Sequence, residues 1–151
     1  GEPRSPLAEA LLFSADRAQH VEHLIQPAIQ AGKLVLVDRY YYSTVAFQGY
    51  GRGYSIETLL SLSDIAIQMC KPDIVLLLDL DPAAGLKRNA EKEEEDRFEL
   101  EEIEFHTKLR QGFLDLAKNL EEPFAVLDAR RAPESILQEA VQYIDRVLAS
   151  R

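Results

Sequence analysis

Apolar residues recur at three- and four-residue steps from Ser5 to Ala31, which is the spacing of one face of an α-helix. The residues of this stripe are Leu7, Leu11, Ala15, Ala18, Val21, Leu24, Ile25 and Ala28. Gly32 follows as a stop signal, because glycine readily takes the backbone conformation that ends helices. The aliphatic run at 33–37 then predicts a buried parallel strand, which ends directly before Asp38.

The remaining pattern alternates helices with short aliphatic runs. We expect helices at 40–47, 55–69, 82 onward, 105–120 and 133–148, strands at 74–80 and 124–127, and a glycine-rich loop at 49–53. Ser55 is the expected N-cap of its helix, and Asp81-Pro82 places a cap residue before a proline at the first helical position. Strands that alternate with helices predict an α/β fold with a parallel sheet.

Length and charge narrow the class of protein. A chain of 151 residues without a linker or repeat predicts one domain that covers residues 1–151. The net charge of −9 argues against broad binding of nucleic acid, which requires a basic face. No apolar run approaches the roughly 20 residues of a membrane-spanning helix. The single cysteine, Cys70, cannot form an internal disulfide, which fits a reducing cytoplasm.

Asp38 and Arg39 are the first candidates for chemistry. Ligands of open parallel sheets bind at the carboxyl ends of the strands, and the pattern places both residues at such an end. A carboxylate there is suited to a hydrated Mg²⁺ ion, and a guanidinium group is suited to two parallel hydrogen bonds with a phosphate. A structural ion pair is the alternative, and spacing does not separate the two interpretations.

A second acid–base pair, Asp16-Arg17, lies in the middle of the first predicted helix, one turn after Phe13. A charged pair on a helix usually belongs to a solvated face, and an aromatic residue beside it usually belongs to the core. From the pattern alone we therefore expect a solvated pair here.

Residues 88–97 form a charged segment between two predicted helices, with Arg88, Lys92 and Arg97 among glutamates. Such a segment is suited to a lid that closes over phosphates and excludes water. Composition alone favours a solvated charged loop, because acidic residues outnumber the basic ones.

Three motifs in order resemble the thymidylate kinase family, over a match that runs from about Ser5 to the C-terminus. They are Ala8-Glu-Ala-Leu-Leu-Phe-Ser-Ala-Asp-Arg-Ala-Gln-His20, Val37-Asp-Arg-Tyr-Tyr-Tyr-Ser-Thr-Val-Ala-Phe-Gln-Gly49 and Asp96-Arg-Phe-Glu99. The resemblance implies a P-loop kinase-like, three-layer α/β/α fold with a parallel sheet. It also implies transfer of the terminal phosphoryl group of ATP to dTMP to give dTDP, with Mg²⁺ as cofactor, by a cytoplasmic homodimer.

The resemblance also assigns roles to residues. On the acceptor side it implies that dTMP is bound by Phe13, Arg17, Arg39, Ser43, Thr44, Phe47 and Gln48. Arg39 would hold the phosphate of dTMP, and Asp38 would help place Mg²⁺ and the reacting phosphates. On the donor side, Arg88, Ala129 and Arg130 would lie by the adenine, while Lys92 and Arg97 would act from the lid at 88–97.

The sequence departs from the family pattern at the loop that holds the donor phosphates. The family begins with a strand and a Gly-x-x-x-x-Gly-Lys-Ser/Thr loop that holds the donor phosphates, and the 151 residues contain no such motif. We therefore expect the C-terminal three-quarters of such a kinase, without its first strand, P-loop and first helix, and inactive by itself. Two alternatives stay open: a kinase for another nucleotide, and a non-catalytic relative that binds a nucleotide or a partner.

Overall fold

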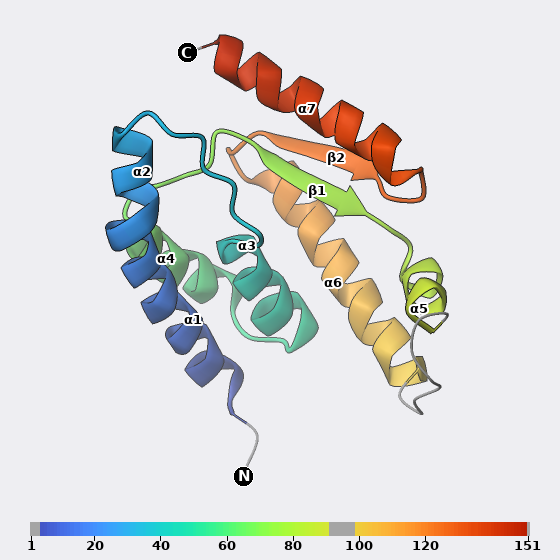
Figure 1. Ribbon diagram of the computed structural model, residues 1–151. Coiled ribbons are helices and arrows are strands. Elements are labelled where there is room, and N and C mark those ends of the chain that lie inside the picture. The colour runs from blue at the N-terminus through green and yellow to red at the C-terminus, as the bar shows by residue number, and fades with distance from the viewer. Residues whose placement is uncertain (1–3, 91–98, 151) are drawn as a thin grey trace. The chain divides into compact units, whose positions relative to one another are not determined.

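The computed structural model describes residues 4–90 and 99–150. The chain divides into two compact units, residues 1–71 and residues 72–151, and each is described by itself (Figure 1). The organisation as a single domain stays a prediction.

The first unit is built from helices. In chain order they are α1 (Pro6–His20), η1 (Val21–Ile25), α2 (Gln26–Gln30), α3 (Tyr41–Thr44), η2 (Val45–Gly51) and α4 (Ile56–Ile67). The first three form the long helix that the apolar stripe predicts, and its middle part, η1, is π-helical. The Ser5 hydroxyl caps this helix by accepting a hydrogen bond from the Ala8 amide at 3.2 Å. Gly32, with φ of 70°, ends it.

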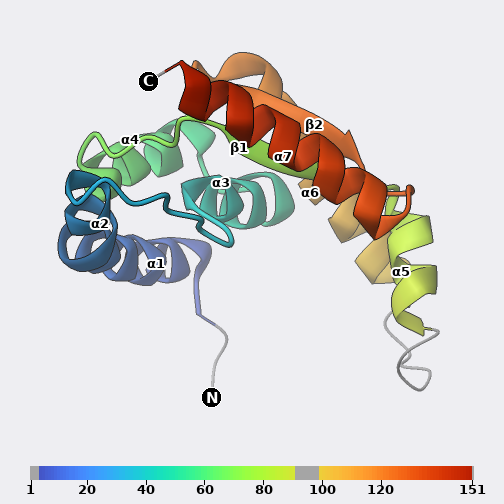
Figure 2. The ribbon, with the colours of Figure 1, turned by 45° about the horizontal axis from the view of Figure 1, so that its top comes forward.

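The core of the first unit lies where α1 packs against α3, η2 and α4 (Figure 2). Its buried apolar residues are Ala10, Val21, Ile25, Tyr41, Tyr42, Val45, Ala46, Leu59, Ala66 and Ile67. The π-helical η2 replaces much of the predicted glycine-rich loop. Gly49 allows η2 to approach α4 closely, because a Cβ atom at that position would collide with the side chain of Ile56.

The predicted buried strand at 33–37 is wrong. These residues adopt no ladder pairing in the structure, and Leu34 and Leu36 are 59% and 74% exposed. A strand requires a neighbour for its backbone N–H and C=O groups, and in the described residues the sheet consists of two other strands. The aliphatic composition of the run therefore does not by itself make it a strand.

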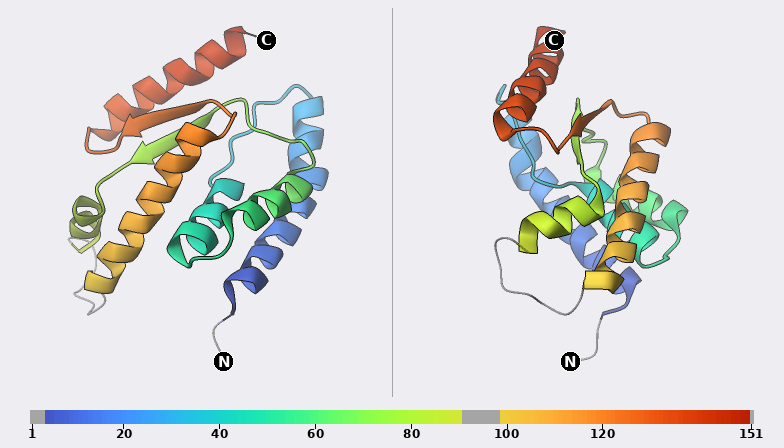
Figure 3. Two further views of the ribbon diagram at one scale, coloured as in Figure 1. Left: turned by 180° about the vertical axis from the view of Figure 1, so that it is seen from behind. Right: turned by 90° about the vertical axis from the view of Figure 1, so that its right-hand side faces the viewer.

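The second unit contains this sheet and the helices that cover it. In chain order its elements are β1 (Val75–Asp79), α5 (Pro82–Ala90), α6 (Glu99–Asn119), β2 (Phe124–Asp128) and α7 (Pro133–Ala149). The two strands pair in parallel, from Val75 opposite Phe124 to Asp79 opposite Asp128. Helices α6 and α7 lie on opposite faces of the sheet, which gives this unit three layers (Figure 3). The strands predicted at 74–80 and 124–127 are therefore confirmed.

Local signals set the helix ends as predicted. The Ser55 hydroxyl accepts a hydrogen bond from the Thr58 amide at 3.2 Å and begins α4. The Asp81 carboxylate accepts hydrogen bonds from the amides of Ala83 and Ala84, at 3.0 and 3.4 Å, and Pro82 is the first residue of α5. Among the described helices, none combines the length and apolar character that a membrane span requires.

Two paired leucines of the sheet provide a test of this core. Leu127 on β2 is fully buried, whereas Leu78, its partner on β1, is 58% exposed. We expect Leu127→Ala to lower the free energy of unfolding by about 2–5 kcal/mol, because it removes buried methyl groups and leaves a cavity. Leu78→Ala is the matched control and should cost less than about 1 kcal/mol. Urea denaturation of both variants gives the comparison, and equal losses would contradict the described core.

Candidate functional site

A partly buried guanidinium group lies at the packing of α1 against α3. Nη2 of Arg17 donates a hydrogen bond to Oγ1 of Thr44 at 3.2 Å, and Cζ lies 5.6 Å from the centroid of the Tyr40 ring. Nη1 is also buried, and it has no hydrogen-bond partner among the described residues. The expectation of a solvated pair is therefore wrong for Arg17, although Asp16 is exposed.

The surroundings of Arg17 hold it in place. The Tyr40 hydroxyl donates a hydrogen bond to the backbone carbonyl of Cys70 at 2.9 Å, which fixes the ring beside the guanidinium group. Burial raises the pKa of the Tyr40 hydroxyl, so that it stays protonated and able to donate. Burial lowers the pKa of Arg17, while nearby Tyr40 and Asp16 oppose that shift. The charge is thus desolvated, and one of its donor groups is left for another acceptor.

Arg39 adopts an uncommon backbone conformation, with φ of 67°. A non-glycine residue in this left-handed region costs on the order of 1–3 kcal/mol and persists where its surroundings hold it. The Cζ atom of Arg39 lies 5.6 Å from the centroid of the Phe47 ring on η2, a cation–π distance. Asp38 precedes it as an exposed residue of the same bend.

A polar cluster joins α1 to η2 at Gln48. The Gln48 side chain is 3% exposed, and its Nε2 donates a hydrogen bond to Oε2 of Glu9 at 3.0 Å. The same carboxylate oxygen accepts a hydrogen bond from Nη1 of Arg52 at 2.6 Å. Hydrogen bonds from Arg52, then from Gln48, lower the pKa of Glu9. Glu9 is therefore held in its ionised, accepting form.

In the second unit, charges gather at the carboxyl ends of both strands. Asp79 and Asp128 are partners in the sheet register, so their like charges are neighbours. Arg110 of α6 binds Asp79 through two hydrogen bonds of 2.7 and 2.9 Å. Arg130 binds Asp128 through two hydrogen bonds of 2.9 and 2.8 Å. These paired contacts offset the repulsion and hold the pKa of each aspartate below its ordinary value.

Helix α5 reaches the loop after β2 through Arg88. Its Nη2 donates a hydrogen bond to the backbone carbonyl of Ala129 at 3.2 Å. Arg130 follows directly, with its side chain exposed and turned back onto Asp128. The three residues expected on the donor side thus lie together at this end of the sheet.

The metal assignment rests on Asp38. Within the described ranges, no group of three or more His, Cys, Asp or Glu side chains is arranged to hold a metal ion. Mg²⁺ bound to nucleotides typically uses one or two carboxylates, with phosphate oxygens and water completing its shell. A single exposed carboxylate next to Arg39 fits that donor set.

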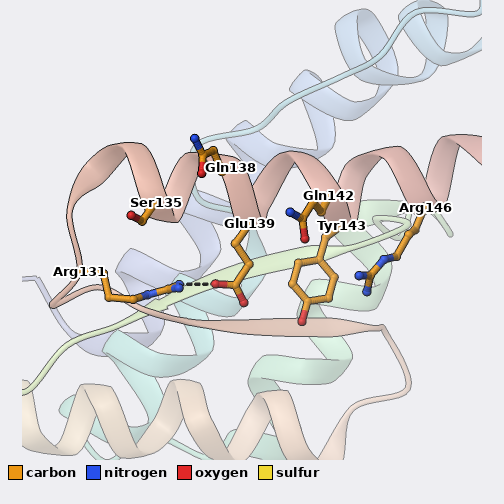
Figure 4. A pocket seen from close by; sticks show the side chains of 7 residues that line it. All are labelled: Arg131, Ser135, Gln138, Glu139, Gln142, Tyr143 and Arg146. Carbon is orange, nitrogen blue, oxygen red and sulfur yellow. Dashed lines mark hydrogen bonds and ion pairs between the residues drawn. The ribbon is translucent and has the colours of Figure 1, made fainter.

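A polar pocket of about 370 Å³ runs along α7 and the residue Arg131 before it (Figure 4). It is lined by Arg131, Ser135, Gln138, Glu139, Gln142, Tyr143 and Arg146. An ion pair joins Arg131 to Glu139, and the Arg146 guanidinium lies 5.3 Å from the Tyr143 ring centroid. The pocket contains none of the residues that the sequence singles out, and its charged side chains are already paired or stacked.

Comparison with known proteins decides the family. Residues 1–140 match the family model described as thymidylate kinase. The chain belongs to the thymidylate kinase family. It is 43% identical over 151 residues to a thymidylate kinase of Desulfovibrio desulfuricans, a match that covers 95% of this chain and 70% of that protein. A thymidylate kinase of Carboxydothermus hydrogenoformans is 44% identical over 143 residues, with the same coverage of 95% and 70%.

The fold agrees with this assignment. The crystal structure of a thymidylate kinase from Ehrlichia chaffeensis matches with a TM-score of 0.73 and 27% sequence identity. The match covers 95% of this chain and 67% of that chain. The predicted α/β fold of the P-loop kinase type is therefore confirmed.

The structure brings into contact several of the residues to which the resemblance assigns roles. The contacting pairs are Arg17 with Thr44, Arg39 with Phe47, and Arg88 with Ala129. Phe13 is 52% exposed on α1, and Ser43 precedes Thr44 in α3. Lys92 and Arg97, together with most of the predicted lid at 88–97, lie outside the described residues.

Sequence reasoning missed Glu9, Arg52 and Arg110. Glu9 belongs to the first motif and lies two helical turns before Arg17, but the resemblance gives it no role. Arg52 falls in the predicted glycine-rich loop, and Arg110 falls in the helix predicted at 105–120. Their partners lie 39, 43 and 31 positions away, so no local pattern marks these contacts.

The Asp79–Arg110 pair predicts a dependence of stability on pH. Because Arg110 lowers the folded-state pKa of Asp79, the pair stabilises the fold above the unfolded Asp pKa of about 3.9 and loses this effect as pH falls through the folded value. We expect Arg110→Met to destabilise the chain at pH 7 and to reduce the loss of stability between pH 7 and pH 3. Urea denaturation at pH 7 and at pH 3 measures the free energy of unfolding of this variant, with Lys118→Met as the control. An unchanged pH dependence would contradict the linkage.

Proposed function

We propose that this chain acts in the transfer of the terminal phosphoryl group of ATP to dTMP, giving dTDP for the synthesis of dTTP. Its relatives of 43% and 44% identity are named thymidylate kinases. The observation that carries the proposal is the partly buried Arg17 guanidinium, whose enclosed Nη1 atom lacks a hydrogen-bond partner among the described residues. A buried donor of this kind requires an acceptor, and a ligand carbonyl can supply it.

The acceptor base would be held by the first unit. Thr44 accepts the hydrogen bond from Nη2 of Arg17, which would leave Nη1 to donate to the exocyclic O4 of thymine. Phe13 and Phe47 would pack against the base, and Ser43 and Gln48 would contact its edge or the surrounding pocket. The stiffness of the Arg17 environment supports this role, because a donor that is already oriented loses little freedom when it binds.

Arg39 and Asp38 would hold the reacting phosphates. The guanidinium group of Arg39 is suited to two parallel hydrogen bonds with the phosphate of dTMP, and its contact with Phe47 links phosphate binding to base binding. Asp38 would hold Mg²⁺ together with phosphate oxygens, and that ion would neutralise negative charge on the nucleotides. Phosphoryl transfer depends chiefly on such positioning and charge stabilisation.

The donor purine would bind beside Arg88, Ala129 and Arg130. The hydrogen bond from Arg88 to the Ala129 carbonyl joins α5 to the loop after β2 and supports a stable surface for a flat base. Lys92 and Arg97 would stabilise the charge of the transferring group from the lid at 88–97. Cationic side chains are what this chemistry requires at that point.

The proposal extends to assembly and location. We expect a homodimer in the cytoplasm, with dTMP and ATP as its ligands and without nucleic acid or membrane as a partner. Leu11 and Leu24 are 49% and 60% exposed along α1 and η1, and they offer apolar surface for a second copy.

Calorimetric titration of the chain with dTMP tests the acceptor site. We expect Arg17→Met to weaken dTMP binding by roughly 10- to 100-fold, because it removes a hydrogen bond from a charged donor. Arg146→Met on α7 is the matched control and should bind dTMP as the wild type does. Thermal melting of each variant shows whether the fold is retained.

The outcomes separate the alternatives. Equal binding by wild type and Arg17→Met would reject Arg17 as the base-recognition residue. Tighter binding of another nucleoside monophosphate would favour a different kinase specificity. Binding of dTMP without turnover in the presence of ATP and Mg²⁺ would favour the non-catalytic alternative.

A further inference from the structure

Glu9 and Gln48 form a contact that the proposed roles do not explain. A carboxylate of α1 accepts a hydrogen bond from Nε2 of Gln48 at 3.0 Å, and Arg52 donates to the same oxygen at 2.6 Å. Gln48 is almost completely buried, with 3% of its surface exposed. A buried amide that binds a fixed anion cannot rotate freely, so this contact determines which end of the amide faces elsewhere.

The orientation of the amide follows from the chemistry of its partner. An ionised carboxylate accepts hydrogen bonds and donates none, so only the NH₂ end of Gln48 can face Glu9. Arg52 reinforces this arrangement because it keeps Glu9 ionised. The carbonyl end, Oε1, is therefore directed away from Glu9. It is buried and has no hydrogen-bond donor within the described part of the chain.

Gln48 belongs to the same structural segment as the contacts of Arg17. Thr44 and Gln48 are one helical turn apart along α3 and η2, and both pair with side chains of α1. This packing layer thus contains a buried donor, Arg17 Nη1, and a buried acceptor, Gln48 Oε1, that lack partners in the described residues. An imide edge carries the complementary groups, a carbonyl oxygen and an adjacent ring N–H.

We propose that Glu9 is a positioning residue that fixes the Gln48 amide with its carbonyl toward the acceptor base. This arrangement selects a pyrimidine with a proton on N3, such as thymine or uracil, over cytosine, whose N3 is a hydrogen-bond acceptor. The inference rests on the proposed function, since it assumes that the acceptor base binds beside Arg17. It assigns Glu9 to base selection without contact between Glu9 and the nucleotide.

A purely structural role for Glu9 makes a different prediction. If Glu9 only joined α1 to η2, its replacement would loosen the site and weaken the binding of all pyrimidine nucleotides to the same extent. If Glu9 orients the amide, its replacement lets Gln48 rotate and present NH₂ to N3 of cytosine. Preference between bases, rather than affinity alone, therefore distinguishes the two roles.

The test uses Glu9→Gln, which keeps the size of the side chain but can present either a donor or an acceptor to Gln48. Calorimetry measures the affinities of dTMP, dUMP and 5-methyl-dCMP for the chain. We expect the preference for dTMP over 5-methyl-dCMP to fall about three- to tenfold, the range of one hydrogen bond. The preference for dTMP over dUMP should stay constant, because both bases carry the N3 proton. Glu57→Gln, an exposed carboxylate of α4, is the matched control.

A second variant tests whether Glu9 acts through Gln48. In a Gln48→Met background, which removes the amide at similar volume, Glu9→Gln should no longer change the preference for dTMP over 5-methyl-dCMP. An unchanged preference in the single variant, or an effect that persists without Gln48, overturns the proposal for Glu9. Failure of the wild-type chain to bind dTMP overturns the proposed function instead.

Discussion

The candidate site depends on one positively charged group inside the first unit, the Arg17 guanidinium, only part of which is hydrogen-bonded. The Arg17 guanidinium lies between α1 and α3, where Thr44 accepts one of its hydrogen bonds and the Tyr40 ring packs beside it. Desolvation of a cation is costly unless its donors are satisfied. The packing therefore holds a donor group ready for a polar acceptor, and the proposed recognition of a base by Arg17 rests on this arrangement.

The second unit depends on a comparable balance of charge. Parallel pairing from Val75–Phe124 to Asp79–Asp128 places two carboxylates side by side at one edge of the sheet. Arg110 and Arg130 each bind one of them with two hydrogen bonds. Arg110 comes from α6, and Arg130 comes from the loop after β2. Their hydrogen bonds to the two aspartates therefore also hold this helix and this loop against the sheet. The loop includes Ala129, whose carbonyl accepts the hydrogen bond from Arg88.

Much of the fold could be predicted because its signals are local. The caps at Ser5, Ser55 and Asp81 act within three residues, and the apolar stripe of α1 depends on helical spacing alone. The run at 33–37 shows the limit of this approach. Its aliphatic side chains are typical of a strand, yet a strand exists only where a neighbour pairs with its backbone, and composition carries no information about that neighbour.

The sequence by itself determined the family, most of the helices, both paired strands and the positions of the candidate residues along the chain. Only the tertiary structure decided which side chains meet, such as Arg17 with Thr44 across 27 positions and Gln48 with Glu9 across 39. It also decided that Arg17 is partly buried, with its Nη1 atom enclosed, while Asp16 beside it is exposed. The physical reason is that helix and cap signals act between neighbours along the chain, whereas burial and hydrogen-bond partnership arise from packing between distant segments.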